Sequence, residues 1–150
     1  MSRKAADRQS RKPRRRSQPS RERECGSAIT EMALLVPLIV LLTLGAFELG
    51  RGVWTKHTLS HISREAARYA SVRSARSDDP ATAVKVASRA RSEAAGIDLD
   101  RLEVVTTWNP GNQPNARVRV QVSYEFEPVT PLLPFESITL TSNSERVIVY

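Results

Sequence analysis

The sequence predicts an α+β protein with a long N-terminal membrane-spanning helix that continues as an amphipathic helix. A second short helix and a small antiparallel sheet of about three strands are expected to follow. An uncharged apolar run fills residues 32–47, and an apolar stripe with helical spacing follows at residues 59–70. From residue 101 the apolar pattern has a period of two, which indicates strands. We therefore expect one long helix to lead from a membrane into an outer domain.

The apolar run has the length of a membrane span. Extended to Ala28 and Leu49 it covers 22 residues, and a helix of that length measures about 33 Å. The hydrocarbon core of a bilayer is roughly 30 Å thick, so the run is long enough to cross it. Pro37 removes one backbone donor and crowds the carbonyl of Ala33, which predicts a bend between these residues.

The basic residues that precede the span predict its orientation. Residues 1–24 hold ten Arg or Lys and three acids, so they carry the whole net charge of +7. The positive-inside rule places this end in the cytoplasm and the C-terminal domain outside. We predict a basic cytoplasmic leader at 1–26, which is a candidate for cleavage, a transmembrane helix at 27–50 and an extracytoplasmic domain at 51–150. The leader lacks interleaved aromatic residues and known nucleic-acid motifs, so we expect no nucleic-acid partner.

The junction between leader and span resembles the start of type IV and Flp-type pilins. In those pilins, as in this chain, a basic leader ends in a glycine, and a glutamate follows at the head of an apolar helix. The resemblance implies that a prepilin peptidase cuts between Gly26 and Ser27, which makes Glu31 the fifth residue of the mature chain. The new α-amine on Ser27 is then available to pair with Glu31 of the same or a neighbouring subunit. An equally open alternative is that Glu31 only reaches the cytoplasmic interface of the membrane.

Residues 27–70 resemble the TadE-like family in the order and spacing of several short motifs. The shared features are an acid and a proline in the apolar run, an acid ahead of Gly-Arg, and a later Arg-Glu-Ala-Ala-Arg-Tyr. In this chain they are Glu31, Pro37, Glu48, Gly50, Arg51, Arg64, Glu65, Arg68 and Tyr69. Met32 departs from the family, in which an aromatic residue is more frequent there.

The resemblance implies a minor pilin-like component, or pseudopilin, needed for assembly of tight-adherence (Flp-type) pili. It also implies a single-pass protein of the inner membrane, with the N-terminus in the cytoplasm, and leaves open whether this protein enters the pilus. The implied partners are the membrane, other pilin-like subunits, the pilus assembly platform and the prepilin peptidase.

An alternative function is an uncleaved, membrane-tethered binding or sensor module with its basic tail on anionic lipids. Cleavage after Gly26 distinguishes the two, since only the pilin-like function requires it. An enzyme is not expected, because the sequence shows no catalytic constellation or cofactor motif. His57 and His61 are four residues apart on the predicted helix, but no third ligand accompanies them, so we expect no metal and no cofactor.

The outer domain is predicted to contain two helical segments. The long helix should cover Ala28 to Arg73, and Glu65 should reach Arg68 on its polar side. Its apolar stripe consists of Leu59, Ile62, Ala66, Tyr69 and Ala70. A second helix should begin at Pro80, after two acids, and should end at Ala95, ahead of Gly96.

Three strands should complete the domain. Alternating apolar residues predict them over residues 102–108, 118–126 and 138–149. A Pro-, Gly- and Asn-rich turn at 109–115 separates the first two, and a proline-rich connection at 128–134 separates the last two. Leu132, Leu133 and Phe135, in and just after this connection, would form either a partner patch or a plug for the core.

Overall fold

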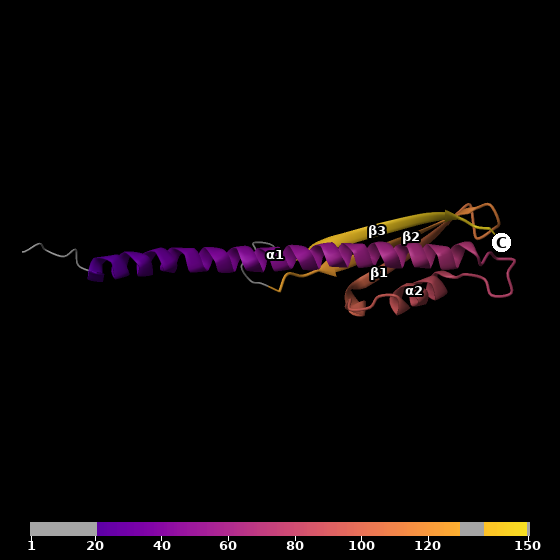
Figure 1. Ribbon diagram of the computed structural model, residues 1–150. Coiled ribbons are helices and arrows are strands. Elements are labelled where there is room, and N and C mark those ends of the chain that lie inside the picture. Colours follow the sequence, from indigo (N-terminus) through magenta and orange to yellow (C-terminus); the bar gives the residue numbers. More distant parts are fainter. Residues whose placement is uncertain (1–20, 130–136, 150) are drawn as a thin grey trace, which may run out of the picture. The chain divides into compact units, whose positions relative to one another are not determined.

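The computed structural model (Figure 1) describes residues 21–129 and 137–149, with side chains from Gly26 onward. It shows the predicted α+β fold: a long apolar helix, a short helix and three antiparallel strands. The chain divides into two compact units, residues 1–40 and residues 41–150. Most of the basic leader and the predicted patch of Leu132, Leu133 and Phe135 lie outside the described residues.

Helix α1 (Arg21–Ser71) is the long helix, and it begins earlier and ends slightly earlier than predicted. Its early start is consistent with the Arg and Glu residues at 21–24, which favour helix. At its other end, the carbonyl of Ser71 accepts a hydrogen bond from the Val149 N–H at 2.9 Å. The C-terminal segment of the chain therefore contacts the last turn of the helix.

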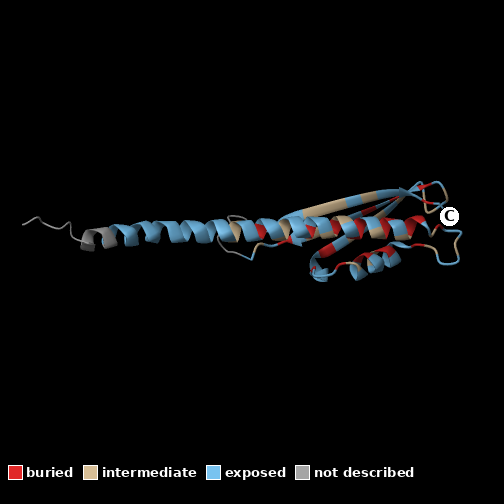
Figure 2. Ribbon diagram, in the orientation of Figure 1, coloured by how far each residue is buried: buried red, intermediate tan, exposed pale blue. Residues whose placement is uncertain are grey.

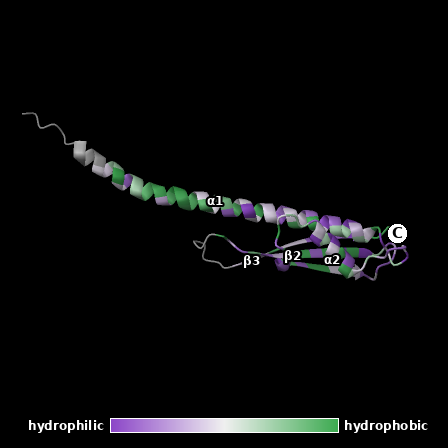
Figure 3. Cartoon of the chain, turned by 90° about the horizontal axis from the view of Figure 1, so that it is seen from below, coloured by the Kyte–Doolittle hydropathy of each residue, from purple (hydrophilic) through white to green (hydrophobic). Residues whose placement is uncertain are grey.

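In the first unit, α1 presents its apolar side chains to the surroundings. Ile29 and Leu34 are 70% and 74% exposed, and this part of the helix is uniformly pale in Figure 2 and largely green in Figure 3. Among the described residues, α1 is the one helix long and apolar enough to cross a membrane. The helix continues through Pro37, and the bend expected there stays a prediction.

The sheet of the second unit consists of β1 (Leu102–Asn109), β2 (Arg117–Phe126) and β3 (Ile138–Val147), antiparallel and in that order. Its register places Val122 opposite both Val104 and Ser142. On β2 the residues alternate as predicted, since the side chains of Val118, Val120 and Val122 are fully buried. β3 ends before the predicted Val149, because the N–H groups of Ile148 and Val149 bond to Ala116 and Ser71 instead of to β2.

The buried half of α1 and the inner face of the sheet share one core. The predicted stripe is confirmed: Leu59, Ile62, Ala66 and Ala70 are fully buried in this core, and Tyr69 packs against it. Figure 2 shows this change from exposed to buried along the helix. Burial of a Leu or Ile side chain stabilises the fold by roughly 1.5–3 kcal/mol, so these contacts anchor the domain to α1.

The second helix, α2 (Ala83–Ser92), is shorter than the predicted Pro80–Ala95. Its N-cap is Thr82, whose side-chain oxygen accepts a hydrogen bond from the Lys85 N–H at 3.3 Å. A Thr side chain at the N-cap satisfies a backbone N–H of the first turn, which explains why the helix begins at Ala83, three residues after Pro80. Gly96 follows the helix with φ +73°, and a Cβ placed there would lie 3.0 Å from the Trp54 ring.

Asn112 connects the β1–β2 turn to the segment between the two helices. Its Nδ2 donates to the carbonyls of Arg73 and Ala81, at 3.1 and 3.0 Å. Its backbone carbonyl accepts from the Ala75 N–H at 2.8 Å. One side chain thus satisfies two backbone acceptors from a segment far away in the sequence.

We expect Asn112→Ala to lower the free energy of unfolding by about 1–2 kcal/mol, because it removes two partly buried hydrogen bonds. The Arg73 carbonyl keeps the Ala81 N–H as a donor at 3.0 Å, whereas the Ala81 carbonyl loses the Asn112 side chain that donates to it. The measurement is chemical denaturation of the full chain in detergent, followed by circular dichroism. Asn143→Ala is the control, since Asn143 is exposed on β3 and its loss should change little. Equal effects of the two substitutions would contradict this role of Asn112.

Candidate functional site

Glu48 is a buried acid on an otherwise apolar stretch of α1. Its side chain is 5% exposed. The Arg51 Nη1 donates to Glu48 Oε2 at 2.8 Å, and the Val129 N–H donates to Oε1 at 2.9 Å. The Arg51 guanidinium also lies 5.0 Å from the centre of the Phe126 ring. We call these four residues the Glu48 clasp.

The clasp fastens the end of β2 and the residues after it to α1. Residues three apart on a helix share a face, so Glu48 and Arg51 meet without distortion. Hydrogen bonds to a carboxylate from a cation and from a backbone N–H offset the cost of burying the charge. The family resemblance singled out Glu48 and Arg51, but no sequence pattern indicated Phe126 and Val129 as their partners.

Gly50 has no packing role within the described chain. It is exposed, and a Cβ placed there would meet no atom within 4 Å. The Gly-Arg pair of the motif thus combines a residue with open space around it and a residue that belongs to the clasp.

The Arg-Glu-Ala-Ala-Arg-Tyr motif is divided between the surface and the core. Arg64 is exposed, and Arg68 pairs with Glu65 at 2.8 Å, as predicted. The hydrogen bond from Arg68 lowers the pKa of Glu65 below its ordinary value of 4.5. Tyr69 packs against the core, and the Arg73 guanidinium lies 4.0 Å from the centre of its ring.

The residues of the predicted processing site lie in the first unit. Gly26, Ser27, Glu31 and Pro37 are all exposed and helical. The Thr30 hydroxyl donates to the Gly26 carbonyl at 2.9 Å. Among the described side chains, Glu31 forms no ion pair.

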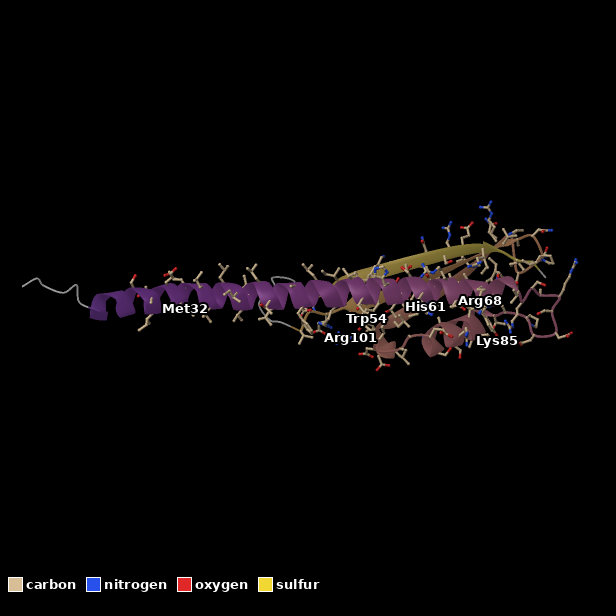
Figure 4. The ribbon with its side chains drawn as sticks, in the orientation of Figure 1. Met32, Trp54, His61, Arg68, Lys85 and Arg101 are labelled. Carbon is tan, nitrogen blue, oxygen red and sulfur yellow. The ribbon has the colours of Figure 1, made fainter. Side chains whose placement is uncertain are left out.

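His57 and His61, the two histidines of the chain, are both exposed on α1. His61 Nε2 lies 3.8 Å from Glu93 Oε2, and His61 and Arg68 are labelled on the same helix in Figure 4. Within residues 21–129 and 137–149, no group of three or more His, Cys, Asp or Glu is placed to hold a metal ion.

The segment of α1 that carries these motifs matches a known protein family. The family model described as TadE-like protein matches residues 26–68. The comparisons with curated proteins and with solved structures found no match. The matched segment includes Gly26, Glu31, the Glu48–Arg51 pair and Arg68, which lies within the Arg-Glu-Ala-Ala-Arg-Tyr motif. The resemblance predicted from the motifs is confirmed, since residues 26–68 are similar to the TadE-like family.

Proposed function

We propose that this protein is a minor pilin-like component, or pseudopilin, needed for assembly of tight-adherence (Flp-type) pili. The observation that carries the proposal is the TadE-like match over residues 26–68. The family suggests a protein associated with the Tad pilus. The matched residues form a single helix, exposed and apolar at first and later buried in the core of a folded domain.

The distribution of burial along α1 supports this function. The apolar side chains of residues 29–42 are exposed, so they are available to the hydrocarbon of a bilayer or to the helices of sibling subunits. The distal half is occupied by the core of its own domain. Contacts between subunits are therefore expected mainly along the first half, in the inner membrane, with the domain outside.

Processing by a prepilin peptidase after Gly26 is part of the proposal. The helix includes both Gly26 and Ser27, so the peptidase has to unwind its first turns. Glycine is a poor helix former, by about 1 kcal/mol relative to alanine, which favours unwinding at this position. Cleavage would place a new α-amine on Ser27, four residues from Glu31. Pairing of the two between subunits would set the register of packed helices and engage the pilus assembly platform.

A second candidate is an uncleaved, membrane-tethered binding module. One observation favours it: α1 is helical from Arg21 across Gly26, and the Thr30 hydroxyl bonds to the Gly26 carbonyl within the helix. Helical peptide bonds are poor protease substrates, because a protease binds an extended backbone. For both candidates we propose a role in binding and assembly without catalysis.

Glu31→Ala should reduce the number of assembled pili by about tenfold or more and leave the outer domain folded. The substitution removes the carboxylate that is proposed to pair with the Ser27 α-amine. A hydrogen bond to a charged group contributes roughly 1.5–3 kcal/mol, and each 1.4 kcal/mol is about tenfold in an equilibrium constant. The measurement is a count of pili by electron microscopy, with the protein level checked by immunoblot. Glu103→Ala, at an exposed position of β1, is the control. Normal piliation of the Glu31 variant would exclude the assembly role assigned to this residue.

A further inference from the structure

A groove of about 530 Å³ lies in the second unit between α1 and the ends of two strands. Its floor includes Gly45, Leu49 and Gly52 of α1, and its wall consists of Phe126, Ile138 and Leu140. The groove surface is almost entirely apolar. Apolar concave surfaces of this kind favour a hydrocarbon ligand over a polar one.

The glycines leave the floor of the groove open. A Cβ placed on Gly45 or Gly52 would meet no atom within 4 Å. A larger side chain at Gly52 would therefore project into free space and would not clash with the domain. Glycine in a helix costs roughly 0.5–1 kcal/mol relative to alanine, and packing against the described residues does not explain it at these positions.

The groove adjoins the exposed apolar surface of α1 at the end of the membrane-spanning segment. Leu49, Val53 and Trp54 are 73%, 58% and 50% exposed, and Trp54 is labelled on α1 in Figure 4. Tryptophan is frequent at the boundary between hydrocarbon and headgroups. Such a position gives the acyl chain of a phospholipid direct access to the groove.

A cation lines the same groove. Lys56 is exposed, and its ammonium donates to the carbonyl of Thr141, which leaves two of its three N–H donors for another acceptor. His57 lines the groove beside it. Glu48 also lines it, but both of its carboxylate oxygens accept hydrogen bonds within the clasp. The available charge is positive and fits a phosphate.

We infer that this groove binds one acyl chain of an anionic phospholipid, with the phosphate of the headgroup at Lys56. The inference combines an apolar groove, an open glycine floor and a cation at the end of a membrane span. It goes beyond the proposed function, because it requires insertion into a membrane and does not require pilus assembly.

Native mass spectrometry of the full chain in detergent micelles tests the lipid site. The probes are dioleoylphosphatidylglycerol and, separately, dioleoylphosphatidylcholine, added in a titration. We expect one retained phosphatidylglycerol per chain, most of it lost in Gly52→Leu, whose side chain fills the groove. Gly50→Leu is the matched control, since Gly50 has equal open space but does not line the groove. It should retain the lipid.

Lys56→Gln provides a second, independent variant. It should weaken retention of phosphatidylglycerol by about fivefold and that of phosphatidylcholine less, because the trimethylammonium group of choline offsets the charge of the phosphate near Lys56. Three results would overturn the inference: equal retention in the Gly52 and Gly50 variants, equal retention of both lipids by the unmodified chain, or a second chain bound in place of lipid. Circular dichroism verifies that each variant is folded. If Gly52→Leu is unfolded, the retention of phosphatidylglycerol by Lys56→Gln tests the inference.

Discussion

Glu48→Ala should lower the free energy of unfolding of the outer domain by about 3 kcal/mol. The substitution removes the acceptor of two hydrogen bonds, so the Arg51 guanidinium and the Val129 N–H lose their common partner. Breaking a buried ion pair by removing one partner typically costs about 3–5 kcal/mol. We expect about 3 kcal/mol, the lower end of this range, because the Arg51 side chain is 33% exposed and is partly hydrated.

Glu65→Ala is the matched control for Glu48→Ala. Glu65 also pairs with an arginine three residues further along α1, at the same 2.8 Å, but this pair is near the surface. Exposed ion pairs contribute roughly 0–1 kcal/mol, so the control should unfold almost like the unmodified protein. The measurement is denaturant unfolding of the full chain in detergent. Two variants of equal stability would show that the clasp does not fasten β2 to α1.

The second large effect is expected from Ala66→Leu. Ala66 is fully buried where α1 packs on the domain core, and three extra carbon atoms have no room there. Overpacking of this kind costs typically 1–3 kcal/mol, and we expect about 3 kcal/mol because the site is rigidly enclosed by a helix and a sheet.

Ala46→Leu tests the same substitution on the exposed half of α1. The added side chain would project away from the domain, so the midpoint of unfolding should stay within experimental error. Thermal unfolding followed by circular dichroism measures both variants. If Ala66→Leu is as stable as Ala46→Leu, the alanines of α1 form a loosely packed surface and not the core of the domain.

The helices and strands whose apolar residues recur at a clear spacing were predicted well from the sequence. The alternation around Val118, Val120 and Val122 gave strand β2 and its buried face, and the stripe through Leu59 and Ile62 gave the packed side of α1. Boundaries were less accurate, because they depend on local competition for hydrogen bonds. For this reason α2 begins at Ala83, after the N-cap Thr82, and not at Pro80.

The candidate site was predictable only in part. Glu48 and Arg51 stood out in the sequence through their family resemblance, and their spacing placed them on one side of a helix. Their partners, Phe126 and Val129, are about 80 residues away in the chain. No local pattern indicates such a long-range contact. The same holds for Asn112, which looks like an ordinary turn residue and yet bonds to two distant carbonyls.

Intact-mass analysis of the protein purified from its native membrane tests the proposed pilin-like function most directly. We predict a chain that begins at Ser27, since the mechanism requires a new α-amine near Glu31. A chain that retains residues 1–26 would contradict this mechanism and would favour a permanently tethered module.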